Sequence, residues 1–419
     1  MNSRSFSFVH VADLHLDSPF KGITAKNPAI ADPLRSATFQ AFDALIDLCI
    51  EREVQFLVVA GDIYDGEDRS LRAQLRFHDG LVRLAEKNIA TYVVHGNHDP
   101  YDSRSSALSF PAMVHILGYR TVESMPFQRE GATVAVISGI SHAKKNETEN
   151  LAKRFRRRAS EPFHIGLLHC TVGSNTGHDP YAPCQLSELL EVEFDYWALG
   201  HVHEKSVLDN RSSVLYPGNT QGRSFREKGK RGCHIVTVED GAISNLEFYA
   251  LDAIRWAEID VSIEGIPTLD RLCLAFHTSV RDLAAKADGR AVICRTRLTG
   301  RGALYQELRK GNNVEELLER VRESLAYEDP FVWVQEIDFH CRPEIDLEER
   351  RKGADFLAQV LRISRELRDE PTKARQRELS DILSNRAVRG AVEGFTDDEI
   401  RAMVERAELI CIDALEADE

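Results

Sequence analysis

The chain lacks several features that would each assign it to a class of protein. Its 419 residues contain no apolar run of about 18 residues, the length that a membrane-spanning helix needs. Its eight cysteines include no Cys-x-x-Cys pair, which argues against a zinc ribbon and against a disulfide framework. No Walker A motif occurs, so the chain does not hydrolyse ATP through a P-loop. The N-terminal residues carry no signal peptide, so we expect a cytoplasmic protein with no membrane partner.

An excess of positive charge is also absent. The formal net charge is −14, from 53 Lys and Arg against 67 Asp and Glu, so bulk electrostatics do not favour nucleic-acid binding. Two local basic segments, residues 153–158 and 223–231, are exceptions. The first is either a solvent-exposed face or a contact surface. We expect the second to contact phosphate, because it follows a Pro-Gly-Asn loop close to the last of the motifs described next.

Five short polar segments each follow an apolar run, and together they form the most informative pattern in the chain. They are Asp13-Leu14-His15, Gly61-Asp62-Ile63-Tyr64-Asp65, Gly96-Asn97-His98-Asp99, His169 and Gly200-His201-Val202-His203. Short apolar runs that end at glycine or a polar residue are typical of buried strands. Because loops at strand ends converge at one edge of a sheet, we expect the five segments to form one site.

The side chains of these segments are metal ligands of mixed type. Imidazole suits Zn, Mn, Fe or Ni, whereas carboxylate and carboxamide oxygens suit Mg and Mn, so the set favours Mn, with Fe, Zn or Mg as alternatives. Two ions roughly 3.5–4 Å apart can hold a phosphate and generate a hydroxide, and one carboxylate must then bridge them. Each segment alone has a common structural explanation, as a turn or a surface loop. All five in this order indicate a two-metal phosphoesterase.

These motifs resemble those of the calcineurin-like metallophosphoesterase superfamily. Within it, the chain is most similar to the Mre11/SbcD nuclease family and to its bacterial YhaO-type members. Three further segments carry the resemblance: Tyr216–Arg223, Glu227–Gly229 and Arg342–Glu348. The resemblance is clearest over residues 1–250. It implies an α/β fold in which a sandwich of two mixed sheets is flanked by helices.

The resemblance also implies how the ligands divide between two ions. The first ion would be held by Asp13, His15, Asp62 and His203, and the second by Asp62, Asn97, His169 and His201, with Asp62 as the bridge. His98 would donate a proton to the leaving oxygen or stabilise the transition state. Asp65 would orient His98. Cys170, beside His169, is a less favoured alternative ligand.

The pattern of the chain changes near residue 250. Strand-like segments at 256–263, 291–298 and 332–337 alternate with helical stripes at 269–285 and 313–325. We therefore expect a phosphoesterase domain over residues 1–250 and a small α/β cap domain over residues 251–345. In the resembled family, a unit at this place restricts which DNA ends reach the metals.

Residues 346–419 have the pattern of amphipathic helices. Apolar stripes occur at 356–361 and 379–383, and Thr396 with Glu399 forms a capping box that starts the last helix. Such narrow apolar faces need a cover, which is either this chain or another protein. The resemblance implies a coiled-coil ATPase of the SbcC/Rad50 type as the partner, and it suggests a homodimer.

We therefore expect a two-metal-dependent DNA nuclease, an exonuclease subunit of a DNA repair complex that cuts phosphodiesters with a metal-activated hydroxide. One alternative is another calcineurin-like phosphoesterase that acts on nucleotides, cyclic nucleotides or phosphoproteins. A non-enzymatic alternative is a scaffold that recruits an ATPase. The complete ligand set argues against the scaffold, because degenerate members lose ligands.

Overall fold

A computed structural model describes residues 5–20, 28–66, 70–101, 108–157, 162–173, 180–211, 213–369 and 396–416. The chain divides into two compact units. The first comprises Met1–Ile259, His277–Thr296 and Leu318–Glu336, and the second comprises Asp260–Phe276, Arg297–Leu317 and Ile337–Glu419. None of the helices within these described ranges has the length and apolar character needed to cross a membrane.

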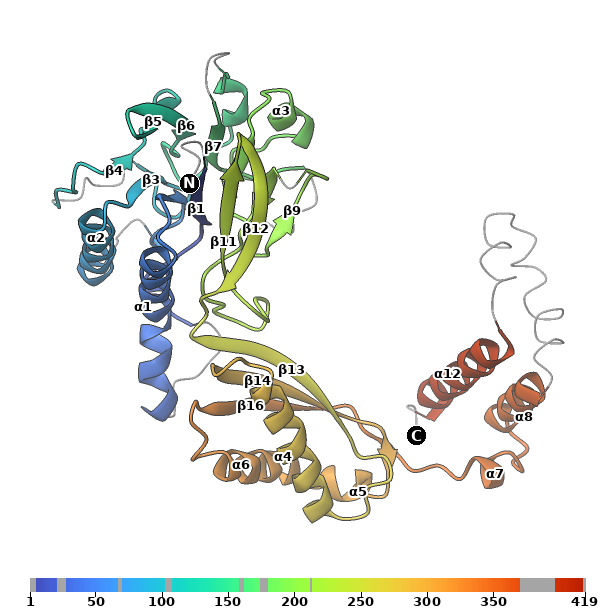
Figure 1. Ribbon diagram of the computed structural model, residues 1–419. Coiled ribbons are helices and arrows are strands. Elements are labelled where there is room, and N and C mark those ends of the chain that lie inside the picture. Colours follow the sequence, from blue (N-terminus) through green and yellow to red (C-terminus); the bar gives the residue numbers. More distant parts are fainter. Residues whose placement is uncertain are drawn as a thin grey trace, which may run out of the picture. The chain divides into compact units, whose positions relative to one another are not determined.

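The first sheet of unit 1 has six strands in the order β12-β11-β1-β2-β3-β4. They are β1 (Phe6–Val11), β2 (Phe56–Ala60), β3 (Ala90–Val94), β4 (Val114–Ile116), β11 (Gly232–Glu239) and β12 (Ala242–Ala250). Helices α1 (Pro28–Glu51) and α2 (Leu71–Glu86) cover one face of this sheet (Figure 1), where Phe42 and Phe77 pack against strand residues such as Val59.

The second sheet also has six strands, in the order β5-β6-β7-β8-β10-β9. They are β5 (Glu123–Arg129), β6 (Ala132–Ile140), β7 (His164–His169), β8 (Tyr196–Gly200), β9 (Ser206–Val207) and β10 (Val214–Tyr216). Its outer face is covered by η1 (Leu151–Arg154) and α3 (Leu186–Leu190) around Trp197. A buried core that includes Phe8, Phe56 and Tyr196 joins the inner faces of the two sheets. The predicted sandwich of two mixed sheets is therefore confirmed.

Strand direction brings the five polar segments to a common edge. Strands β1, β2 and β3 are parallel neighbours in the first sheet, and β7 and β8 are parallel neighbours in the second. Each of these strands ends at one of the segments, as the sequence predicts. Parallel strands present their carboxyl ends at the same side of a sheet, which is where α/β proteins generally place functional loops.

The elements expected after residue 250 are present. They are β13 (Ile254–Ser262), α4 (Leu269–Ala285), β14 (Ala291–Thr299), α6 (Asn313–Ser324) and β16 (Val332–Phe339), with the short β15 (Arg301–Gly302), α5 (Tyr305–Leu308) and β17 (Arg342–Pro343). Strands β13, β14 and β16 form one three-stranded sheet. The order of strands and helices follows the prediction, whereas the domain limits at residues 250 and 345 stay a prediction.

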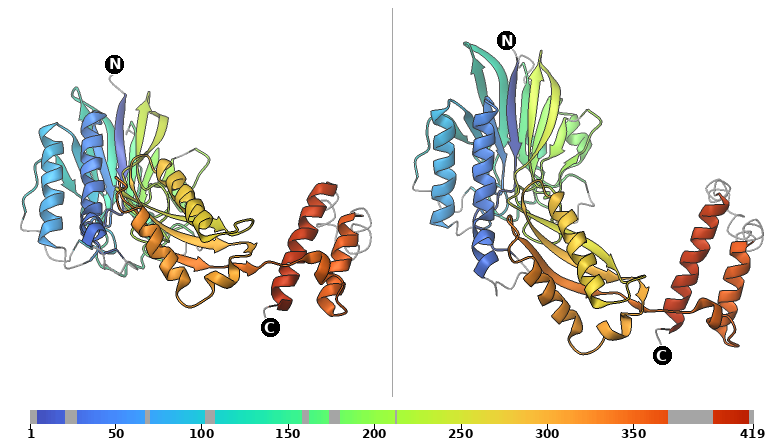
Figure 2. Two further views of the ribbon diagram at one scale, coloured as in Figure 1. Left: turned by 90° about the horizontal axis from the view of Figure 1, so that it is seen from below. Right: turned by 60° about the horizontal axis from the view of Figure 1, so that its bottom comes forward.

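The C-terminal part of unit 2 is helical. It consists of α7 (Leu347–Arg350), α8 (Phe356–Asp369) and α12 (Asp397–Glu416), and α8 and α12 lie side by side (Figures 1 and 2). The predicted capping box is confirmed, since the Thr396 amide donates to Glu399 at 2.7 Å and the Glu399 amide donates to Thr396 at 3.3 Å. The predicted stripe at 379–383 lies outside the described residues.

Of the two covers considered for the first stripe, the chain itself supplies the one over Leu357 and Leu361. Leu357 and Leu361 are buried against Ile412 of α12, so the chain itself covers them. Arg351 and Arg368 also reach across to Glu408, whose side chain is only 2 % exposed. The apolar contact and the ion pairs together hold the two helices as one hairpin-like pair.

Leu361→Ala is expected to destabilise this helix pair by about 2–5 kcal/mol, because it removes a fully buried side chain and leaves a cavity. Hydrogen exchange of the α8 and α12 amides would measure the loss. Phe356→Ala, at a position 66 % exposed on the same helix, is the matched control and should change protection little. Equal protection in the two variants would show that the pair does not depend on this contact.

Candidate metal centre

All seven predicted metal ligands lie together at the carboxyl ends of β1, β2, β3, β7 and β8. Six of them are buried: Asp13, His15, Asp62, Asn97, His169 and His201. The seventh, His203, has a side chain that is 18 % exposed. The ligands come from five segments that span about half of the sequence, and only the folded sandwich brings them together.

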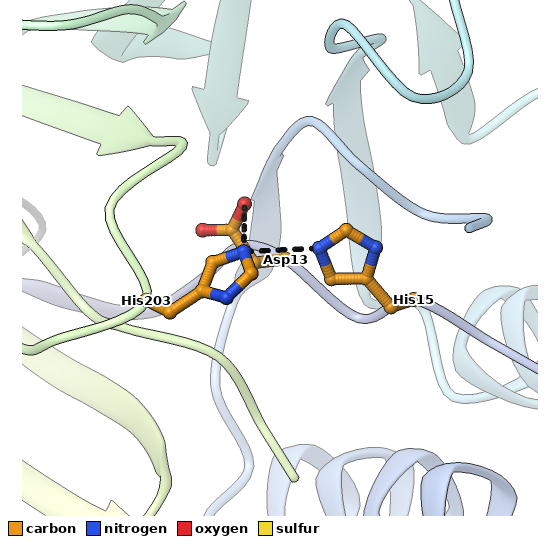
Figure 3. A group of neighbouring side chains, drawn as sticks. All are labelled: Asp13, His15 and His203. Atoms are coloured by element: carbon orange, nitrogen blue, oxygen red, sulfur yellow. Dashed lines mark hydrogen bonds and ion pairs between the residues drawn. The ribbon is translucent and has the colours of Figure 1, made fainter. Parts of the chain in front are cut away.

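Asp13, His15 and His203 form the first group (Figure 3). His15 Nε2 and His203 Nε2 are 3.1 Å apart, and His203 Nε2 is 4.0 Å from an Asp13 carboxylate oxygen. The other ring nitrogen of each histidine faces a carboxylate: His15 Nδ1 lies 3.1 Å from Asp65, and His203 Nδ1 lies 2.7 Å from Glu227. The 2.7 Å hydrogen bond to Glu227 places the proton of His203 on Nδ1, so His203 Nε2 presents its lone pair toward His15 Nε2 at 3.1 Å.

The second group surrounds the carboxamide oxygen of Asn97. This oxygen lies 3.0 Å from His169 Nε2 and 3.2 Å from His201 Nδ1. His169 Nδ1 donates to the Ala60 carbonyl at 2.8 Å, which fixes the ring with Nε2 directed at the Asn97 oxygen. One carboxamide oxygen and two imidazoles form a donor set that suits a divalent ion.

Asp62 lies between the two groups. Its Oδ2 atom is 3.4 Å from His169 Nε2 and 3.8 Å from His15 Nε2. Its Oδ1 atom accepts a hydrogen bond of 2.9 Å from the His98 amide, which fixes the carboxylate. A carboxylate in this position reaches both groups, as a bridging ligand must.

The backbone of the site is unusual for the residues that form it. Asp13, His15, Asp62 and His201 all have positive φ angles, between 42° and 104°. Such conformations cost about 1–3 kcal/mol each and cluster at functional sites. The site requires glycine at position 96, because a Cβ there would collide with the Asp62 carboxylate. The fold maintains this strained arrangement because the rest of the sandwich supports it.

The ionisation states of the buried groups also fit a metal. Burial raises the pKa of Asp13 to about 6, and burial lowers the pKa of His15 to about 3, which keeps its imidazole neutral. For Asp62, burial alone would raise the pKa, but His169, His15 and His98 hold it well below its usual value. For His169, burial would lower the pKa, but Asp62 raises it to about 9. Deprotonated carboxylates and neutral imidazoles bind metal, and a cation beside Asp62 would replace the proton of His169.

His98 lies at the open side of the site. Its side chain is 38 % exposed, and its Nδ1 donates to the Asp65 carbonyl oxygen at 3.3 Å. The Asp65 carboxylate is 3.8 Å from the same nitrogen, which fits the predicted orienting contact. The carboxylate also accepts a hydrogen bond from Arg223 at 2.8 Å and lies against His15. The sequence did not indicate these two additional contacts.

Two residues outside the predicted set support the site. Asp99 accepts hydrogen bonds from the Ile63 and Gly96 amides, and it thereby ties together the loops that follow β2 and β3. Glu227 accepts from His203, as described above. Both follow or lie within segments that the sequence pattern singled out, but nothing in the sequence assigned them a contact.

The basic segments are largely neutralised within the protein. In the second segment, Arg223, Lys228, Lys230 and Arg231 pair with Asp65, Glu258, Asp288 and Glu204. In the first, Lys153, Arg154 and Arg157 pair with Glu188, Glu149 and Asp195, and Arg158 lies outside the described residues. These three cations of the first segment therefore have carboxylate partners within the chain. In the second segment, the pairing reduces the charge available to a phosphate.

Cys170 does not join the ligands. Its sulfur lies 3.9 Å from that of Cys184, within the core on the outer face of the second sheet. Cys170 directly follows the last residue of β7, and its side chain packs with Leu189 and Trp197, whereas His169 lies in the site.

The fold and the paired metal-ligand groups define the calcineurin-like metallophosphoesterases. The calcineurin-like phosphoesterase family matches residues 6–205, and the family of the middle domain of the metallophosphoesterase YhaO matches residues 256–342. YhaO of Bacillus subtilis is 33 % identical over 96 % of both chains. The protein belongs to this YhaO-type family of metallophosphoesterases, and it is a metal-dependent phosphoesterase.

More distant relatives have names that state a role in DNA metabolism. The DNA double-strand break repair protein Mre11 of Thermoplasma acidophilum is 27 % identical over 59 % of this chain and 66 % of its own length. The SbcD component of the nuclease SbcCD of Bacillus subtilis is 26 % identical over 56 % of this chain and 66 % of its own length. The chain thus spans about two thirds of each of these two relatives.

Proposed function

We propose that the protein is a two-metal DNA nuclease, an exonuclease that works in a repair complex of the Mre11/SbcD kind. The observation that carries the proposal is the convergence of six potential metal ligands around a seventh, Asp62, with the His98 side chain beside them 38 % exposed. The names of two relatives, a DNA repair protein and a component of a nuclease, supply the substrate class.

In this proposal each metal ion has four ligands. Asp13, His15, Asp62 and His203 hold the first ion, and Asp62, Asn97, His169 and His201 hold the second, with manganese as the preferred metal. When bound, two such ions polarise the phosphate and lower the pKa of water, which supplies the nucleophile. The protein contributes the rigid strand ends and the hydrogen bonds that keep the imidazole lone pairs directed into the site.

His98 is the proposed catalytic residue. Its amide is tied to Asp62 and its Nδ1 to the Asp65 carbonyl oxygen, so its Nε2 is left for the substrate. From this position the ring can donate a proton to the leaving oxygen or stabilise the charge of the transition state. Asp65 positions it, through the backbone carbonyl and the nearby carboxylate.

The proposed partners are DNA and a coiled-coil ATPase of the SbcC/Rad50 type, with a homodimer as the proposed assembly. The similarity to the SbcD component of the SbcCD nuclease supports an assembly of this kind. Since Leu357 and Leu361 are buried, the ATPase would have to contact other residues, such as Met403 and Ile410 on the exposed side of α12. The three-stranded sheet with α4 and α6 is proposed as the cap that restricts access of DNA ends.

A second candidate function is hydrolysis of a small phosphodiester such as a cyclic nucleotide. The net charge of −14 and the neutralised basic segments favour it, because long DNA is bound mainly through its phosphates. The same ligands would serve both reactions, so only the substrate separates them.

The test is a digestion panel with Mn²⁺ and the purified chain. It compares single-stranded, blunt-ended and hairpin DNA with bis-p-nitrophenyl phosphate and with cyclic nucleotides. We expect cleavage of DNA and of the small diester, and loss of both after exhaustive chelation. If cyclic nucleotides are hydrolysed while the DNA stays intact, the nuclease proposal is wrong and the second candidate function takes its place.

A further inference from the structure

Glu227 is a firmly anchored acidic side chain outside the proposed ligand set. It lies in the loop between β10 and β11, and its side chain is 14 % exposed. One carboxylate oxygen accepts the Nδ1 proton of His203 at 2.7 Å. The other accepts from the Asn219 carboxamide at 3.0 Å and from the Arg223 amide at 2.7 Å. The carboxylate is therefore fixed at both oxygens, and one of them is committed to His203.

The contact between Glu227 and His203 differs in charge from the contact at His169 Nδ1. His169 Nδ1 donates to a neutral carbonyl, whereas His203 and His15 both have carboxylates behind their Nδ1 atoms. A carboxylate partner makes an imidazole a stronger base and fixes which nitrogen presents its lone pair. The two histidines proposed for the first ion thus differ electronically from His169, one of the two histidines proposed for the second ion.

Arg223 connects the two carboxylates. Its guanidinium donates to Asp65 at 2.8 Å and lies 3.6 Å from the Glu227 oxygen that accepts from His203. The Arg223 side chain is 14 % exposed, and its charge offsets those of the Asp65 and Glu227 carboxylates, whose side chains are 25 % and 14 % exposed. Asp65, Arg223 and Glu227 therefore form one chain of contacts behind His15 and His203.

We propose that Glu227 is a positioning residue for the first metal ion, acting through His203 and linked through Arg223 to Asp65. The inference rests on the proposed assignment of His203 as a ligand. By holding the proton on Nδ1, Glu227 keeps the Nε2 lone pair directed toward Asp13 and His15. Loss of this contact frees the His203 ring to rotate and to change tautomer. This lowers the affinity for the first ion and leaves binding at the Asn97, His169 and His201 group unaffected.

Titration of the metal-free protein with Mn²⁺, followed by calorimetry, tests the proposal without any substrate. We expect the wild type to bind two ions and Glu227→Ala to bind one of them about 10–100-fold more weakly, the usual effect of losing such a partner. Glu227→Gln should show a smaller loss, because its carboxamide oxygen can still accept the Nδ1 proton. Glu204→Gln is the matched control, since Glu204 is next to His203 but is 69 % exposed and pairs with Arg231.

The outcomes are distinct. Wild-type affinity for both ions in folded Glu227→Ala would overturn the proposal. An equal loss of affinity in Glu204→Gln would also overturn it, because the loss would then be a general effect of removing a negative charge near His203. If Glu227→Ala does not fold, Glu227→Gln decides, because it keeps the size of the side chain. Fewer than two ions in the wild type would remove the ligand assignment and the proposal with it. Two ions in a wild type that does not cleave DNA would contradict the nuclease function alone.

Discussion

Asp62→Ala is expected to abolish phosphodiester hydrolysis and to weaken the binding of both metal ions. The reason is geometric: the Asp62 carboxylate lies 3.4 Å from His169 and 3.8 Å from His15, so it reaches both ligand groups. Removing it leaves the two ligand groups without the shared negative charge that a pair of cations requires. Metal content after equilibration with Mn²⁺, together with turnover of bis-p-nitrophenyl phosphate, measures the effect.

Two variants make this result specific. Asp47→Ala removes a carboxylate that is 53 % exposed and pairs with Arg83 on the surface, and it should leave metal content and turnover unchanged. Asp13→Ala should weaken mainly the ion of the His15 and His203 group, because Asp13 lies near His203 and accepts from the His201 amide. Retention of both ions and normal turnover in Asp62→Ala would show that Asp62 is not the bridge.

The metal-ligand segments could be found from the sequence because each one is local. The run Phe56–Ala60 predicts a buried strand by its composition, and Gly61-Asp62 marks its end within the same few residues. The same holds for α4, whose apolar spacing gives both its ends over Leu269–Ala285. The parallel pairing of these strands then places the segments together without further information.

Contacts between distant loops could not be predicted in this way. Asp65 and Arg223 are 158 residues apart, and their ion pair depends on how the loop after β10 folds back. Glu227 and His203 are 24 residues apart in two different loops. Neither pair has a spacing that a helix or a strand would produce, so no periodicity reveals it.

The stripe on α8 shows a different limit. Its spacing correctly indicates an apolar face that must be covered, but the spacing contains no information about the cover. Ile412 supplies it from a helix more than 50 positions away, and Arg351 with Glu408 adds a partly buried ion pair. Amphipathic periodicity therefore predicts burial, whereas the partner has to come from the three-dimensional structure.

His98→Ala is expected to retain both metal ions and to lose turnover by about 10²–10⁴-fold, the usual contribution of a positioned acid or base. The His98 side chain is absent from both ligand groups: its Nδ1 is bound to the Asp65 carbonyl, and the ring is 38 % exposed toward the open side. Its backbone amide still holds Asp62 in the variant, so the bridging carboxylate keeps its position. Steady-state kinetics with bis-p-nitrophenyl phosphate should show the loss in kcat, with metal content measured in the same samples.

Asp65→Asn separates positioning of His98 from the support of the first ion. If Asp65 acted on His98 alone, the variant would keep both ions and show a smaller loss of kcat than His98→Ala. Because Asp65 also contacts His15 at 3.1 Å, the variant should in addition bind the first ion more weakly. Excess Mn²⁺ should then partly restore its turnover. His78→Ala is the control and should behave as the wild type. It removes a histidine of α2 whose side chain contacts the Ser109 carbonyl oxygen. A His98→Ala enzyme with both ions and wild-type kcat would exclude His98 from the chemistry.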